Sequence, residues 1–234
     1  MSAGSTSYLE IAPSNITSNT RVSYKNGQPV ISFSIGSQDR LLIPSSVRIC
    51  GNLAIYESGT GDAGVVPLPT TPMNINPKLG CMAFVDQIVL SSQKHKSTIE
   101  HVRQWGRFIS LSEKGSGISG LSIDIHMLPD SQFFNNATAY PDAFYQLTDL
   151  KLICEVVNPS VDELSRMMSV TSGVREYNAI SSYYQTVSAV NSIINFRLGL
   201  SNVLGVFMNF IPSQYLNNLT YDGFSTLPLI DDLT

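Results

Sequence analysis

Charged side chains are scarce in this sequence. They make up 14% of its 234 residues, whereas soluble domains typically carry about 25%. Hydrophobic residues make up 43%, which is enough for a sizeable buried core. A disordered chain has the opposite balance, with few hydrophobic residues and a high net charge, so this class is excluded. A dedicated nucleic-acid binder should be basic, but the formal net charge is -4, so contact with nucleic acid is not expected.

Long apolar runs are also missing. No stretch of about 18 apolar residues occurs, so we expect no membrane span. The first residues lack the basic region and apolar run of a secretory signal, so we do not expect secretion. The three Asn-x-Thr sequons, which begin at Asn15, Asn136 and Asn218, are then expected to be chance matches.

Cysteine is rare, and its spacing forms no motif. Cys50, Cys81 and Cys154 lie far apart and make no CxxC pair. An odd number of cysteines without secretion predicts reduced, buried thiols. Cys50 and Cys154 lie in apolar segments, so we expect them to act as small hydrophobic residues rather than as nucleophiles.

Uncharged polar residues take the place of the missing charge. Ser and Asn together account for 48 of the 234 residues. They solvate a surface without electrostatic repulsion between copies, which favours self-association. Many β-rich domains also use Ser and Asn in turns, so composition alone leaves both interpretations open.

Much of the chain alternates apolar and polar residues with the period of two that is typical of a strand. The clearest case is Val30–Ile35, where three apolar residues are separated only by Ser. Asn26-Gly27 before it predicts a hairpin with Val22–Tyr24. Further strands are expected at Leu41–Ile43, Ser46–Tyr56, Cys81–Leu90, Leu121–Leu128, Leu147–Val157, Tyr183–Val190, Ile193–Leu200 and Val203–Phe210. For Tyr183–Val190 and Ile193–Leu200, periodicity alone does not exclude a helix.

Interruptions of this pattern mark strand ends and loops. Pro44 should end the strand at Leu41–Ile43, and Gly51 predicts a bulge within the next one. The Gly- and Pro-rich stretch Glu57–Pro77 is expected to be a long loop, and Asp130–Gln146 a second irregular stretch.

Two segments favour a helix. In Thr98–Leu111 the apolar residues recur at helical spacing on one side, which predicts an amphipathic helix that Thr98 caps. Ser160 and Glu163 have the spacing of a capping box, which predicts a short helix over Val161–Met168. The sequence therefore predicts a β-sandwich or barrel with two short helices and long loops.

No domain boundary divides the predicted strands. Residues 1–20 and 216–234 have no core pattern of their own, so we expect an N-terminal arm and a C-terminal tail that reach to neighbouring molecules. Between them, residues 21–215 are expected to form one domain.

No motif for catalysis or cofactor binding is found. His95 and His101 are six residues apart, which is not the spacing of two zinc ligands on a helix face. Asp124 and His126 share a strand face and suggest a metal-dependent barrel enzyme, but that site needs a second His later in the chain, and none occurs. We therefore expect no catalytic residue, no cofactor and no metal, and we expect that the protein is not an enzyme.

A basic cluster, Lys94-His95-Lys96 with Arg103 and Arg107, is the one positive patch, and a solvated helix face accounts for it best.

Aromatic residues gather in the second irregular stretch. They are Phe133, Phe134, Tyr140, Phe144 and Tyr145. Flat rings of this kind bind sugars, but aromatic side chains are also enriched at the centre of contacts between subunits. We take these five residues as candidate inter-subunit contacts.

The order of segments adds a resemblance. The stretch Val30–Tyr56 contains Ile43-Pro-Ser-Ser46, and it is followed by a Gly/Pro loop, Asn76–Gly80, the strand Cys81–Leu90 and the helix Thr98–Leu111. This order resembles the opening of a viral jelly-roll capsid protein. The likeness is to the major capsid proteins of the double jelly-roll lineage, such as those of virophages and polinton-like viruses, and it covers roughly residues 22–210.

The resemblance implies a fold and a role. The fold would be an all-β jelly-roll β-sandwich with long loops and one or two short helices. The protein would be a structural capsid protein of the virion, assembled with other copies of itself and with other capsid proteins, most often as a homo-oligomeric trimer or pentamer. A double-roll protein needs two barrels, and this chain supports one, so it is either half of a larger protein or a single-roll component.

The alternative is a lectin-like carbohydrate-binding β-sandwich. It would use Tyr140, Phe144 and Tyr145 together with Asp130 or Asp142, because aromatic rings and carboxylates cluster in one stretch.

Overall fold

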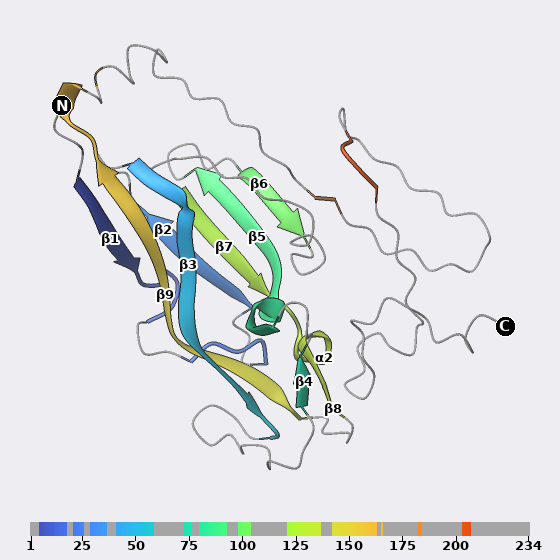
Figure 1. The fold of residues 1–234 in the computed structure, drawn as a ribbon. Helices are drawn as coiled ribbons and strands as arrows, with labels where there is room; N and C mark the ends of the chain where they lie inside the picture. Colours follow the sequence, from blue (N-terminus) through green and yellow to red (C-terminus); the bar gives the residue numbers. More distant parts are fainter. Residues whose placement is uncertain are drawn as a thin grey trace.

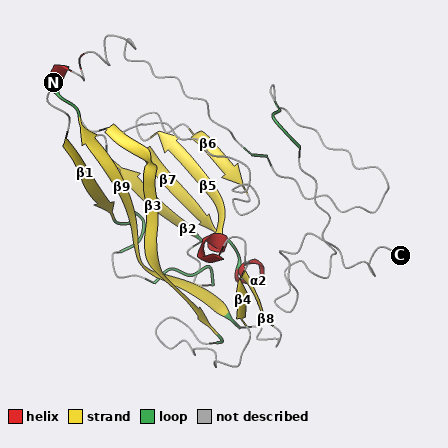
Figure 2. Ribbon diagram, viewed as in Figure 1, coloured by secondary structure: helices red, strands yellow, loops and turns green. Residues whose placement is uncertain are grey.

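Over the residues that it describes, the structure, a computed structural model, is mostly β, with two antiparallel sheets packed together and a short α-helix (Figures 1 and 2). It describes residues 5–17, 21–25, 29–36, 41–58, 73–75, 80–92, 98–103, 121–136, 142–162, 165, 182–183 and 203–206. Its two sheets are consistent with the predicted β-sandwich.

The first sheet has the strand order β1-β9-β3 and the second has the order β2-β7-β5-β6. The strands of the first are β1 (Ser5–Ile11), β9 (Phe144–Asn158) and β3 (Leu41–Tyr56). The strands of the second are β2 (Val30–Ile35), β7 (Leu121–Met127), β5 (Val85–Ser92) and β6 (Thr98–Arg103). A small pair, β4 (Met73–Ile75) with β8 (Phe134–Asn136), lies beside the helix α2 (Asp130–Phe133) at one end of the sheets (Figure 1).

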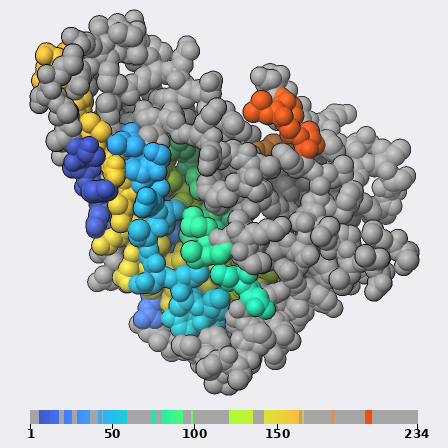
Figure 3. Space-filling model, in the orientation of Figure 1, coloured from blue at the N-terminus to red at the C-terminus, as the bar shows by residue number. Residues whose placement is uncertain are grey.

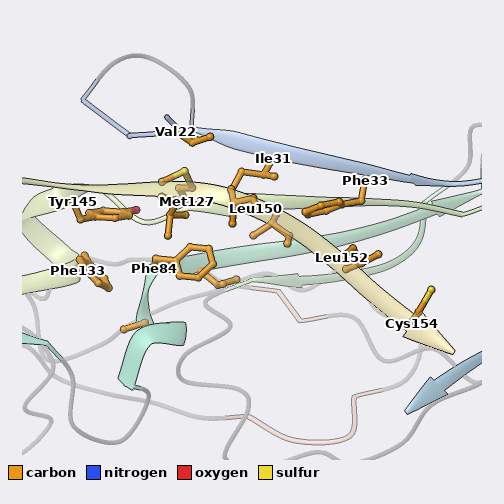
Figure 4. Close-up of a cluster of buried hydrophobic side chains, with 14 of the residues drawn as sticks. Val22, Ile31, Phe33, Phe84, Met127, Phe133, Tyr145, Leu150, Leu152 and Cys154 are labelled. Atoms are coloured by element: carbon orange, nitrogen blue, oxygen red, sulfur yellow. The ribbon is translucent and has the colours of Figure 1, made fainter. Parts of the chain in front are cut away.

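The core lies between the two sheets. Alternate residues of β2 point into it, as do alternate residues of β9 (Figure 4). Fully or almost fully buried members are Val22, Ile31, Phe33, Val85, Ile125, Phe133, Tyr145, Leu152 and Cys154. Burying one such aliphatic or Phe side chain stabilises the fold by about 1.5–3 kcal/mol, so the alternation seen in the sequence fixes which face of each strand turns inward.

The strand with the clearest alternation is confirmed, because β2 spans Val30–Ile35 as predicted. The strand predicted at Leu121–Leu128 is confirmed as β7, and that at Leu147–Val157 is confirmed within a longer β9. Part of the expected arm, Ser5–Ile11, is a strand of the chain's own first sheet and pairs with β9.

The prediction that Pro44 ends a strand is wrong, because β3 continues from Leu41 to Tyr56. Proline cannot donate to the ladder, and the pairing with β9 breaks between Ile43 and Arg48. The Ser46 hydroxyl bridges the break: it accepts from the Glu155 N–H at 2.7 Å and donates to the Ile43 carbonyl at 2.6 Å.

The bulge predicted at Gly51 is confirmed by a register shift between Cys50 and Asn52. A Cβ at Gly51 would lie 2.9 Å from Leu150 Cδ2 and 3.0 Å from the Thr148 carbonyl oxygen, so a larger residue would crowd both neighbours. Opposite it, Asp149 has φ 53° and its carboxylate accepts from the Asn52 amide at 2.9 Å. This kink reverses which residues of β9 face the core.

The strand predicted at Cys81–Leu90 begins later than expected. Gly80–Phe84 form a 3-10 helix whose Ala83 and Phe84 are buried, and the strand starts at Val85. The φ of 55° at Gly80 suits glycine and starts this turn.

The helix predicted at Thr98–Leu111 is wrong over Thr98–Arg103, which form β6 and pair with β5. Ile99 and Val102 are three residues apart, which is the spacing of a helix face and not of an alternating strand, but backbone pairing with the edge of β5 makes this segment a strand. Residues 104–111 lie outside the described part of the chain.

Further predictions differ from the structure in detail. The hairpin between Val22–Tyr24 and β2 is wrong, because Val22 pairs with Leu147 and β2 pairs with β7. The two stretches expected to be irregular contain β4, α2, β8 and the start of β9. Tyr183 and Val203–Val206 are not in strands, and the rest of the three last predicted strands lies outside the described residues. Val161, Asp162 and Ser165 are helical, and the remainder of that predicted helix is likewise outside.

Candidate interaction site

Four of the five aromatic candidates are buried within this chain. Phe133, Phe144 and Tyr145 are 0% exposed and Phe134 is 1% exposed. Tyr140 lies outside the described residues. Their burial gives these four residues a role in the chain's own packing, and a contact with another copy through them stays a prediction.

Tyr145 anchors the end of the core near α2. Its hydroxyl donates to the Leu128 carbonyl, and its N–H donates to Asp130 Oδ1 at 2.9 Å. The centroid of its ring lies 4.2 Å from that of the Phe133 ring. Burial raises the pKa of Tyr145 well above its ordinary value, and burial also raises the pKa of Asp130. The arrangement holds a neutral phenol in a structural role.

Phe144 lies on the opposite side of the first sheet from the core, because it alternates with the core residues Tyr145 and Leu147. It stacks on Tyr56 with ring centroids 5.2 Å apart, and the Lys25 ammonium lies 5.1 Å from its ring centre. Lys25 also donates to the Asp142 carbonyl at 2.9 Å. With Phe144 and Tyr145 covered, neither offers a flat face on which a sugar could stack.

Gln146 follows on the same side as Phe144 and is a residue that the sequence did not single out. It is 1% exposed, and neither its Oε1 nor its Nε2 has a hydrogen-bond partner. Buried amide groups without partners are rare in native proteins, so this side chain costs stability where it stands.

The strands β1, β9 and β3 form this outer face (Figure 3), and polar side chains of β1 and β9 pair on it. Tyr8 is 74% exposed and lies opposite Glu155 on the neighbouring strand. A hydrogen bond to Glu155, and the negative charge of that carboxylate, raise the pKa of Tyr8. Lys151 forms an ion pair with Glu10 at 3.2 Å. The period-two pattern Tyr8-Leu9-Glu10-Ile11 was the signal by which the sequence could have shown this strand.

The chain then crosses from the first sheet to the edge of the second. Ser14 donates to the Ser32 carbonyl from its N–H at 2.7 Å and from its hydroxyl at 3.0 Å. The Asn15 amide bonds to two backbone groups of β2: its Oδ1 accepts from Ser32 N–H at 2.9 Å and its Nδ2 donates to the Val30 carbonyl at 2.8 Å. The segment therefore joins the edges of both sheets.

Other sequence candidates are distributed over the molecule. Asp124 and His126 are half-buried, and they alternate with the buried residues of β7 and so lie on the outer side of the second sheet. Among the described residues, no three His, Cys, Asp or Glu side chains lie together as metal ligands would. The backbone of His101 pairs with Val89. Arg103 of the basic cluster is in β6. The other members of the cluster, Lys94, His95, Lys96 and Arg107, lie outside the described residues.

The prediction of buried thiols is wrong for Cys50 and Cys81, which are exposed. Cys50 alternates with the inward residues of β3, so its side chain points to solvent despite apolar neighbours in the sequence. Cys154 is buried as predicted, and burial raises its pKa.

Several large apolar side chains are exposed. They are Val161, Tyr183, Val203, Leu204 and Val206. Leu204 is 80% exposed, and its short segment is visible on the surface (Figure 3). Within the ranges described, no helix is long and apolar enough to cross a membrane.

Comparison of the sequence with models of known protein families finds no match, and comparison with curated proteins finds none.

Proposed function

We propose that this chain is a structural capsid protein with a jelly-roll fold, which assembles with copies of itself, as a trimer or pentamer, and with other capsid proteins into a virion shell. The observation that carries the proposal is the order in which the strands pair. The capsid resemblance of the sequence and the low charge support the same function.

A jelly roll is a long antiparallel hairpin of eight strands rolled up on itself. The hairpin pairs the first strand with the eighth, the second with the seventh and the fourth with the fifth. Rolling then places the eighth beside the third and the seventh beside the fourth. Taken in chain order, β1, β2, β3, β5 and β6 occupy the first five positions, and β7 and β9 the seventh and eighth.

The pairings in the two large sheets agree with that scheme. The hairpin pairs correspond to β1–β9, β2–β7 and β5–β6. The pairs made by rolling correspond to β9–β3 and β7–β5, and all of them are antiparallel. No strand among the described residues occupies the sixth position. The short strands β4 and β8 are then insertions after the third and seventh positions.

Both capsid proteins and lectins use jelly rolls, so the surface has to separate them. Phe144 and Tyr145 are buried, which removes two of the three rings that a sugar site would need. Exposed apolar side chains such as Leu204 and Val206 are the kind that a self-assembling protein covers with a neighbour. The surface therefore favours the shell protein.

Light scattering and negative-stain imaging of the purified chain test this function. We expect a defined homo-oligomer whose fraction grows with protein concentration. A strict monomer at high concentration, unaffected by salt, would overturn the proposal. Glycan-array binding that Tyr140→Ala abolishes would instead favour the lectin.

A further inference from the structure

We propose that Ser5–Thr17, named here the clasp, is exchanged between two copies of this chain, so that the clasp of one copy pairs with β9 and β2 of the other. This exchange rests on the self-assembly proposed above, and it specifies the residues through which two copies would join. The partner is therefore a second copy of the same chain.

The clasp binds through directional contacts to two sheets. Seven residues of β1 pair with β9 in one register, from Ser5 opposite Asn158 to Ile11 opposite Leu152. Beyond them, Ser14 and Asn15 bond to the backbone of β2. Each of these partners is backbone or side chain that a second copy presents identically, so an exchanged clasp would regain every bond.

The clasp is held mainly by hydrogen bonds and less by the burial of apolar side chains. Within residues 6–17 only Pro13 is buried, while Leu9, Ile11 and Ile16 are half-buried against the core. Its departure would expose one buried and three half-buried apolar side chains of its own, and water would replace most of the broken hydrogen bonds. Segments of this kind open at lower free energy than the rest of a domain.

The connection along the chain permits the exchange. The clasp precedes all the other described elements, so it leaves the fold without unthreading another strand. The chain is next fixed at Val22, whose N–H donates to the Leu147 carbonyl at 2.9 Å and whose carbonyl accepts from the Leu147 N–H at 2.8 Å. Three residues, 18–20, separate the clasp from Arg21. So short a connector favours exchange with a copy packed directly alongside.

Charge does not oppose the exchange. Glu10 is the only charged residue among the first 20, and its ion-pair partner Lys151 lies on β9, the strand to which the clasp moves. A second copy therefore offers the incoming clasp an opposite charge at the matching position.

Disulfide trapping between differently tagged copies tests the exchange. In a background with Cys50→Ser and Cys81→Ser, one copy carries Tyr8→Cys and the other Glu155→Cys, two positions that lie opposite each other in the register. The two copies are co-expressed and gently oxidised. We expect a disulfide-linked dimer that contains both tags. The matched control pairs Tyr8→Cys with Lys151→Cys, which lies four residues along β9 from the partner of Tyr8, and should cross-link at least several-fold less.

A chain that carries both Tyr8→Cys and Glu155→Cys completes the test. If it closes entirely within itself, and the mixed copies give no more dimer than the control, the exchange is excluded. Light scattering on the same samples separates the two proposals, because oligomers without mixed disulfides would leave self-assembly standing and remove only the exchange. Asn15→Ala, which removes both side-chain bonds to β2, should speed the appearance of the mixed dimer several-fold.

Discussion

The side chain of Asn15 binds the backbone of Ser32 as a neighbouring strand would, with its Oδ1 accepting from the Ser32 N–H at 2.9 Å. The same amide donates to the Val30 carbonyl at 2.8 Å. Strand edges with unpaired backbone groups invite pairing with other chains. One side chain therefore closes part of the outer edge of β2 and ties the clasp to the second sheet.

The Asn15→Asp variant should loosen this edge. The Nδ2 donor is replaced by an oxygen that faces the Val30 carbonyl, so we expect a loss of about 1 kcal/mol in the free energy of unfolding. Hydrogen exchange at the Ser32 amide should accelerate as the clasp opens more often. Thr17→Ala is the control, since it removes the same sequon but neither bond, and should leave both measurements unchanged. Equal exchange rates in wild type and Asn15→Asp would contradict the role given to Asn15.

Ser46→Ala should destabilise the first sheet. The Ser46 hydroxyl replaces the ladder bond lost next to Pro44, and without it the Glu155 N–H has no acceptor there. A part-buried donor left unpaired costs about 1–2 kcal/mol. Urea denaturation should show this loss at an unchanged m-value. The neighbouring Ser45→Ala at an exposed position should stay within about 0.5 kcal/mol of wild type, and equal losses at both sites would refute the bridging role.

Gln146→Met should stabilise the chain. Met has a similar shape and removes two buried polar atoms that have no partner, which are worth about 1–3 kcal/mol when unsatisfied. Gln146→Glu places a charge at the same position and should lower the melting temperature. Thermal unfolding of the pair gives opposite shifts if the amide is unpartnered. A loss of stability in Gln146→Met would mean that the amide has a partner in solution.

Asp130→Asn should change how stability depends on pH. Burial raises the pKa of Asp130 above its ordinary 3.8, so the folded state holds this proton more tightly than the unfolded state. The free energy of unfolding therefore falls as the pH rises from about 3.8 through the raised pKa. Asn keeps an oxygen for the Tyr145 N–H and does not titrate, so that part of the fall should vanish.

The measurement is denaturation across this acidic range for wild type, Asp130→Asn and Asp142→Asn. The side chain of Asp142 is exposed, and it is the backbone carbonyl of this residue that Lys25 binds, so its variant should follow wild type. Parallel curves for wild type and Asp130→Asn would show that Asp130 does not carry the effect.

Local pattern was sufficient where one strand face packs against the core. In β2 the alternation of Ile31, Phe33 and Ile35 with Ser fixed both the bounds of the strand and its inward face. The bulge at Gly51 could also be predicted, because glycine inside a strand often marks a bulge or a close approach of neighbouring atoms.

The sequence pattern gave wrong predictions where a partner far away in the chain determines the secondary structure or the pairing. Thr98–Arg103 fit a helix by spacing, but β5 offers backbone groups that pair them as a strand. Val22 precedes an Asn-Gly turn signal, yet it pairs with Leu147, which lies 125 positions further along. The aromatic cluster has the composition of an exposed platform, and only the tertiary structure shows that four of its rings are covered.

The sequence by itself determined the scarcity of charge, the mostly β class and the inward faces of the best strands, because these follow from composition and a period of two. The tertiary structure alone decided which strands are neighbours, which aromatic rings are buried, and how Asn15 meets β2. Those contacts join residues far apart in the chain, and their free energy depends on geometry that no local window contains.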